Sequence, residues 1–114
     1  VYGTSSTGYG VFGSSNTGTG VIAAATAASG LALHAQGAVR FDSAGTDKFV
    51  KDEVSKAVTG VATPPGCKIL VTLNQNPGPG NALKYVKRTS DTGFTVFLLK
   101  PVTGNVSFSY FVIR

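Results

Sequence analysis

The sequence predicts an all-β protein, in which a short-strand β-repeat stalk (a trimeric β-helix or prism) is followed by an antiparallel β-sandwich. Residues 1–20 spell a Gly-, Ser- and Thr-rich decapeptide twice, and a fixed period with glycines in register is typical of stacked architectures. No Lys, Arg, Asp or Glu precedes Arg40. Beyond it, β-branched and aromatic residues alternate with polar ones between turn sequences, as expected of strands. We therefore expect a stalk at residues 1–37 and a C-terminal domain at residues 38–114.

The stalk places an apolar residue at the first position of every ten. This column reads Val1, Val11, Val21 and Leu31. Helix is disfavoured because each Gly costs about 1 kcal/mol relative to Ala, so we expect very short strands joined by Ser, Thr and Gly turns. Ordering the backbone costs about 1–2 kcal/mol per residue, and the leading apolar pair of each decapeptide offsets little of that. The stalk should therefore need partner chains, and three chains around one axis would bury the column as an oligomer core.

Two other interpretations of this region stay open at the level of sequence. A Gly- and Ser-rich segment can be a flexible linker, although a linker does not need regular pairs of Val and an aromatic residue. The Ala-rich third block could form a short helix over residues 21–28. Because the chain begins with Val1 and not with Met, we expect that it was processed or is part of a longer protein, with the repeat continuing upstream.

The C-terminal domain is predicted to contain short strands separated by turns rich in Gly, Pro, Asn and Ser. Residues 51–62 are ambiguous because Val50, Val54 and Val58 recur at helical spacing, but the Val and Thr content favours a strand. A separation of about 12 residues between strands predicts an antiparallel meander or sandwich. The full set of expected strands is Ala38–Phe41, Thr46–Val50 (after a turn at residues 43–45), one within 51–62, Cys67–Leu73, Ala82–Arg88, Phe94–Leu99 and Asn105–Ile113.

The last two predicted strands are apolar on both faces. Phe97 and Leu99 mark this in the first of them, and Phe111 and Ile113 in the second. A strand with two apolar faces is usually buried on both. We therefore expect one face to lie in the sandwich core and the other to meet a neighbouring subunit, which supports an oligomer independently of the repeat.

Both regions resemble known fibre proteins. The Val-Tyr-Gly and Val-Phe-Gly decapeptides resemble repeats of phage tail fibres and bacterial surface proteins, whose stalks are trimeric and β-structured. Residues 69–113, from ILVTLNQNPGPG to VSFSYFVI, are similar to the C-terminal β-domain that follows such repeats, and more loosely resemble the trimeric six-stranded fold of the H-type lectins. The resemblance implies a structural component of a homotrimeric extracellular, cell-surface or virion fibre. A carbohydrate- or receptor-binding tip is the alternative, although the last strand lacks the Trp common in such domains.

Residues suited to catalysis or metal binding are few. His34 is the only His and Cys67 the only Cys, and neither has other ligand types at metal-binding spacing. Asp52 and Glu53 are adjacent, so on a strand their carboxylates would point to opposite faces. We therefore expect no enzymatic activity, no cofactor and no metal site.

The best candidates for ligand binding are Tyr85, Lys87 and Arg88. An aromatic ring beside cationic side chains suits a sugar, a phosphate or an acidic surface. The alternative, which the sequence favours, is an outer strand whose Lys side chains discourage pairing with other strands.

Charge and hydropathy limit the partners. The net charge of +5 is mild and scattered, so we expect no nucleic-acid partner. No apolar run approaches the roughly 20 residues of a membrane helix, so we expect no membrane insertion. The expected partners are copies of this chain, in a homotrimer or a longer filament, and a glycan or cell-surface receptor.

Overall fold

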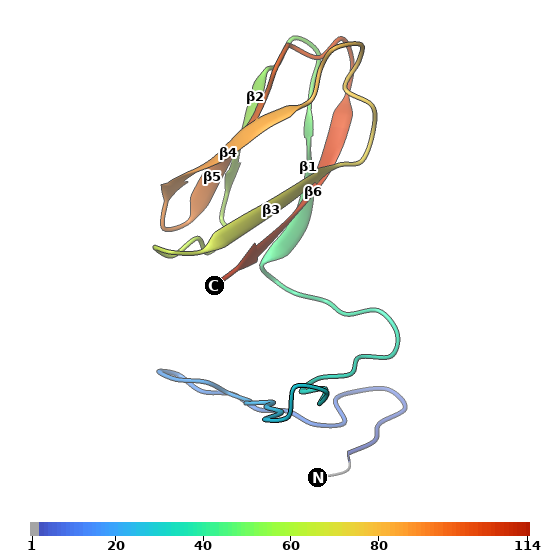
Figure 1. Ribbon diagram of the computed structural model, residues 1–114, viewed down its shortest axis with the longest axis vertical. Helices are drawn as coiled ribbons and strands as arrows, with labels where there is room; N and C mark the ends of the chain where they lie inside the picture. The colour runs from blue at the N-terminus through green and yellow to red at the C-terminus, as the bar shows by residue number, and fades with distance from the viewer. Residues whose placement is uncertain (1–2) are drawn as a thin grey trace. The chain divides into compact units, whose positions relative to one another are not determined.

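The computed structural model describes residues 3–114, so Val1 of the predicted oligomer core lies outside the described residues. The chain divides into two compact units, Val1–Val39 and Arg40–Arg114 (Figure 1). The described residues contain strands, turns and irregular backbone but no helix. The predicted all-β class is therefore confirmed.

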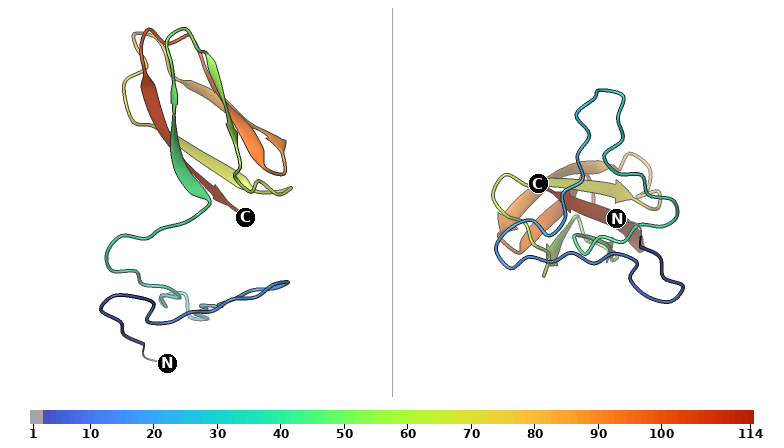
Figure 2. Two further views of the ribbon diagram at one scale, coloured as in Figure 1. Left: turned by 180° about the vertical axis from the view of Figure 1, so that it is seen from behind. Right: turned by 90° about the horizontal axis from the view of Figure 1, so that it is seen from below.

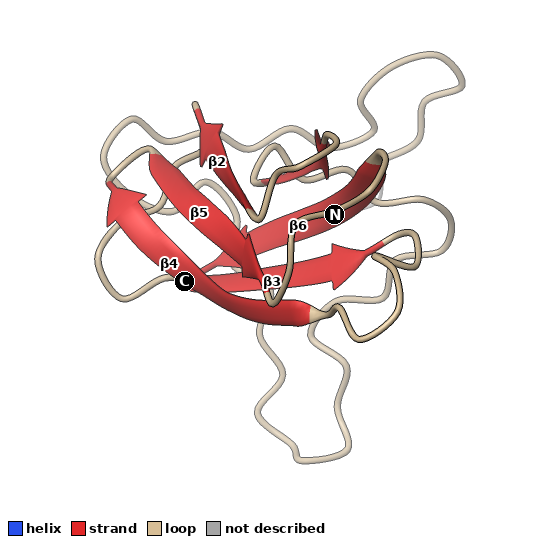
Figure 3. Cartoon of the chain, turned by 90° about the horizontal axis from the view of Figure 1, so that it is seen from above, coloured by secondary structure: helices blue, strands red, loops and turns tan. Residues whose placement is uncertain are grey.

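The second unit consists of two three-stranded antiparallel sheets (Figures 1 and 3). One sheet has the order β1-β6-β3 and the other β2-β5-β4. Their inward faces enclose one core, as in a β-sandwich. The strands are β1 (Ala44–Phe49), β2 (Ser55–Thr59), β3 (Lys68–Leu73), β4 (Leu83–Ser90), β5 (Gly93–Leu98) and β6 (Val106–Ile113).

The connections distinguish this arrangement from a meander. Only β4 and β5 are both consecutive in the chain and paired with each other. The remaining neighbours are distant in sequence: β6 pairs with β1 and β3, and β5 pairs with β2. The chain therefore passes repeatedly from one sheet to the other. The sequence predicted either an antiparallel meander or a sandwich, and the structure has two facing sheets.

The strand predictions are accurate from residue 55 onward, and the predicted strand Thr46–Val50 overlaps β1 from Thr46 to Phe49. The predictions before residue 46 are wrong. No strand forms at Ala38–Phe41, and β1 begins at Ala44, where the sequence predicted a turn. The reason is that Phe41 is held by its side chain, which packs on Phe111 with ring centroids 4.9 Å apart. A turn at residues 42–43 then leads into the ladder, with the Ala44 amide donating to the Phe41 carbonyl.

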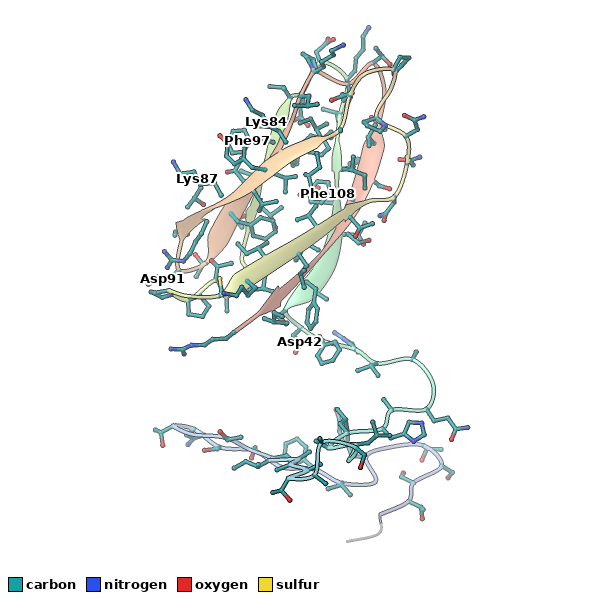
Figure 4. The ribbon with its side chains drawn as sticks, in the orientation of Figure 1. Asp42, Lys84, Lys87, Asp91, Phe97 and Phe108 are labelled. Atoms are coloured by element: carbon teal, nitrogen blue, oxygen red, sulfur yellow. The ribbon has the colours of Figure 1, made fainter. Side chains whose placement is uncertain are left out.

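The core is built from aromatic and aliphatic side chains of both sheets. Phe49 and Phe108 come from the β1-β6-β3 sheet, and their ring centroids lie 5.1 Å apart (Figure 4). Phe94 of β5 packs against the edge of Tyr110 of β6, at a centroid distance of 5.2 Å. The contact between Phe94 and Tyr110 therefore joins the two sheets, and aromatic pairs of this kind stabilise a core beyond their buried area.

Thr63, in the loop after β2, is the buried polar residue of this domain. Its Oγ1 donates to the Ser90 carbonyl at 2.8 Å and accepts from the Gly93 amide at 2.9 Å. Its own amide donates to the Asp91 carbonyl. The hydroxyl therefore ties this loop to the turn between β4 and β5.

Replacing Thr63 by Val should destabilise the domain by about 1–3 kcal/mol, because buried groups of the β4–β5 turn would lose their hydrogen-bond partner. Thr63→Ser is the matched control, since it keeps the hydroxyl and loses one methyl group, worth about 1 kcal/mol. Urea unfolding followed by circular dichroism measures both. A Val variant at least as stable as the Ser variant would show that the hydroxyl does not hold the turn.

The first unit contains no strand in its described residues. Its second decapeptide instead forms a loop closed by two glycines. A Cβ added to Gly13 would lie 2.8 Å from the Gly20 carbonyl oxygen, and one added to Gly20 would lie 2.9 Å from the Gly13 carbonyl oxygen. Within the loop, the Gly18 amide donates to Ser15 Oγ at 3.0 Å. Figure 2 shows the chain running out and back through these residues.

The first decapeptide adopts the same loop. A Cβ at Gly10 would lie 2.8 Å from the Gly3 carbonyl oxygen, and the Gly8 amide donates to Ser5 Oγ at 2.8 Å. We call this unit the pinched loop. The repeated sequence is thus a repeated backbone geometry, which a flexible linker would not need.

The third decapeptide departs from this geometry. Ala23 stands where the second decapeptide has Gly13, and its Cβ is incompatible with so close a backbone approach. Instead, a turn forms in which the Gly30 amide donates to the Ala27 carbonyl at 2.9 Å. The short helix considered for residues 21–28 does not form.

Candidate functional site

An irregularity in β4 determines which of its side chains face outward. Tyr85 pairs with Phe97, whereas Leu83 pairs with Leu98, so Lys84 is an additional residue between two consecutive pairs. Leu98 is buried in the core, and Phe97 is the next residue along β5, so it points outward. Strict alternation along a strand would place Leu83 and Tyr85 on the same face. The bulge instead brings Tyr85 to the outer face and leaves Leu83 on the other face.

Tyr85 lies on this outer face together with Lys84, Lys87 and Phe97, the last three of which are labelled in Figure 4. Tyr85, which is 46% exposed, stacks on Phe97 with ring centroids 4.5 Å apart and an interplanar angle of 17°. Lys84 Nζ lies 5.8 Å from the centroid of the Tyr85 ring. Lys87 pairs with Thr95 two positions further along both strands, which places it on the same face. We call Lys84, Tyr85, Lys87 and Phe97 the aromatic–lysine patch.

Arg88 does not belong to this patch. It pairs with Phe94, a fully buried residue, and so lies on the inward side of β4. Its Nε donates to the Thr63 carbonyl at 2.5 Å, and its Nη2 forms an ion pair with Asp91. Arg88 therefore supports the β4–β5 turn, while two of the three predicted residues, Tyr85 and Lys87, come together.

Sequence reasoning missed Lys84 and Phe97. Both residues lie within predicted strands, but strict alternation would place Lys84 on the face opposite Tyr85. A bulge has no reliable signature in these residues, because it depends on the register with β5. The cross-strand stack of Tyr85 on Phe97 also requires the pairing to be known.

The outer face of the other sheet carries a separate apolar surface. Leu70 of β3, 53% exposed, pairs with Phe111 of β6. Phe41 stacks on Phe111, and Ile113 lies two residues further along β6. We call Phe41, Leu70, Phe111 and Ile113 the apolar patch. It lies at the end of the sheet where the chain enters from the first unit at Phe41.

The remaining half of that face is polar. Ser109, the outward residue before Phe111, lies 3.4 Å from Thr46 through their hydroxyl oxygens and accepts from Asn74 Nδ2 at 3.0 Å. Thr72 pairs with Ser109 on the same side. The hydroxyl groups of Thr46 and Ser109 therefore contact each other. The apolar patch is confined to the other half of the sheet.

Within residues 3–114, no pocket is present and no three His, Cys, Asp or Glu side chains lie close enough to hold a metal ion. His34 is exposed in the first unit, and Cys67 is a half-buried free thiol against the core. Glu53 Oε2 accepts from the Val50 amide, and Oε1 lies 3.9 Å from Lys56 Nζ. No helix in this part of the chain is long and apolar enough to span a membrane.

The chain matches no protein-family model, no curated protein and no solved structure. The candidate surfaces are therefore derived from the structure of this chain without a related protein. They are the repeat with its pinched loops, the apolar patch and the aromatic–lysine patch.

Proposed function

We propose that this chain is a structural component of a homotrimeric extracellular or virion fibre, which assembles through the repeat and through the C-terminal domain. The observation that carries the proposal is the exposure of the predicted oligomer core. In the single chain, Val11 is 62%, Val21 64% and Leu31 79% exposed. Regularly spaced apolar side chains that remain in water are typical of a surface that another chain covers.

The pinched loops explain why these side chains are available. Val11 and Phe12 lie between the pinch at Gly10 and the pinch at Gly13, so each loop is followed by an apolar pair at its base. Full burial of a Val or Leu side chain stabilises by about 1.5–3 kcal/mol. Within residues 3–39 no side chain is buried, so in the proposed fibre this stabilisation comes from partner chains. The β-helix or prism would then form only when chains pair.

The apolar patch provides a second contact between subunits. Leu70 and Phe111 form an apolar surface across β3 and β6, and Phe41 packs on Phe111. In the proposed fibre, a neighbouring copy of the domain would bury this surface in addition to the contact made by the repeat. The number of three chains comes from the resemblance of the decapeptides to trimeric stalks, and a closed symmetric assembly agrees with the general preference of homo-oligomers.

Substitution of the pinch glycines tests this proposal. Gly13→Ala should abolish trimer formation at micromolar concentration, because its Cβ would collide with the Gly20 backbone and open the loop. Gly18→Ala is the matched control: a Cβ there meets only Ser15 Oγ, at 3.4 Å. Light scattering after size-exclusion chromatography gives the mass of each variant. A trimeric Gly13→Ala protein would exclude the pinched loop as the assembling unit.

A second candidate function is a carbohydrate- or receptor-binding tip. The observation that favours it is the aromatic–lysine patch, which lies on the β2-β5-β4 sheet, whereas the apolar patch lies on the other sheet. Assembly through the apolar patch would leave this surface open. Three copies in one fibre would also strengthen a weak site through multivalency.

A further inference from the structure

We propose that the aromatic–lysine patch binds an acidic polysaccharide, with Lys84 and Lys87 pairing with its carboxylate or sulfate groups and a sugar ring packing on Tyr85. This inference rests on the second candidate function, ligand binding at the tip, and assigns the ligand class to it. It does not depend on the number of chains in the fibre.

The charges of this face are complementary to an anion. The described ion pairs join Arg40 with Asp42, Lys56 with Glu53 and Arg88 with Asp91, so within residues 3–114 no carboxylate neutralises Lys84 or Lys87. The outward residues paired along β2 and β5 are Ser55, Ala57, Thr59, Thr95 and Phe97, and none is acidic. An incoming carboxylate or sulfate would therefore meet two cations without an internal competitor.

The aromatic side chains favour a sugar over a simple ion. Tyr85 is held in place by its stack on Phe97, so little side-chain freedom is lost when a ligand packs against it. The exposed part of Tyr85 combines an apolar ring with a hydroxyl group. A sugar ring offers the same combination, with apolar C–H groups and hydroxyls, and Thr95 beside Lys87 adds a further hydroxyl.

The patch is too sparse in charge for a nucleic acid. Strong binding to DNA typically involves about 6–10 phosphate contacts, whereas this face offers Lys84 and Lys87 from each chain. Double-stranded DNA carries one negative charge per about 1.7 Å of its axis, so its recognition calls for more cations than this face offers. The two lysines and one ordered aromatic pair therefore fit the polysaccharide better.

The test measures binding of the full chain to immobilised polygalacturonate (carboxylate) and heparin (sulfate), with dextran as the neutral polymer and double-stranded DNA as the other polyanion. We expect binding to at least one acidic polysaccharide and a loss of at least tenfold in affinity in the K84Q/K87Q variant. Tyr85→Ala should weaken binding similarly. The K48Q/R114Q variant removes two exposed cations, one on β1 of the other sheet and one after β6, and neither is paired with a residue of the apolar patch. It therefore has the same net charge as K84Q/K87Q and should bind within twofold of the wild type.

Four results would overturn the inference: no binding to either acidic polysaccharide, equal binding to dextran, equal loss in K48Q/R114Q and K84Q/K87Q, or tighter binding to DNA that depends on the same two lysines. Light scattering of each variant in the same buffer separates the site from the assembly. A trimer without polysaccharide binding refutes the site alone, whereas a monomer that binds refutes the fibre and leaves the site intact.

Discussion

Phe108→Ala should lower the free energy of unfolding of the C-terminal domain by about 3–5 kcal/mol. Phe108 is fully buried on β6, the central strand of its sheet, and packs on Phe49 at a centroid distance of 5.1 Å. The loss comes from the burial that the ring no longer contributes and from the cavity left behind. A small domain has a total stability on the order of 5–10 kcal/mol, so roughly a third of it or more would be lost. Thermal and urea unfolding followed by circular dichroism measure the change.

The neighbouring outward position provides the control. Ser107 precedes Phe108 on the same strand but points to the outer face. Ser107→Ala should change the free energy of unfolding by less than about 0.5 kcal/mol, as is usual for surface substitutions. Similar losses at both positions would mean that β6 does not separate a core face from an outer face in the way described.

Leu70→Lys should prevent assembly of the proposed trimer and leave folded monomers. Leu70 is the most exposed member of the apolar patch, and it pairs directly with Phe111. The next outward residue of β3 is the polar Thr72. A charge in the centre of an apolar contact leaves an uncompensated buried cation, and residues at such positions typically contribute about 2 kcal/mol or more to association. Because the side chain points away from the core, the free energy of unfolding of the monomer should hardly change.

Thr72→Lys is the matched control for this variant. Thr72 lies two residues further along β3, on the same outer face but in its polar half. The trimer should persist in Thr72→Lys and be lost in Leu70→Lys, as measured by light scattering at the same concentration. Trimers in both variants, or monomers in both, would show that the apolar patch is not the contact between domains.

Much of the second unit could be predicted from the sequence, because period-two alternation and turn residues coincide there. β3, β5 and β6 lie within a residue or two of their predicted bounds. The apolar outer faces of the last two strands were also apparent, since Phe97 and Phe111 alternate with core residues. The strand bounds and the apolar faces depend on residues that are close together in the chain, so they can be predicted from the sequence.

The remaining features depend on pairing between distant segments. The order β1-β6-β3 joins the two ends of the domain, and nothing local indicates it. The bulge at Lys84 turns Tyr85 and Lys87 to the outer face. Arg88 follows Lys87 directly, so strand alternation alone puts it on the opposite face. In the repeat, the glycines suggested turns, but the close contact between Gly13 and Gly20 is set by the path of the loop.

The molar mass of the full chain tests the proposed trimer most directly. Light scattering after size-exclusion chromatography at micromolar concentration should give three times the chain mass of 11.6 kDa. Hydrogen exchange on the same sample should show protected amides in residues 11–33, where the single chain has no strand. A mass of 11.6 kDa with no protected amide in that range would contradict the account.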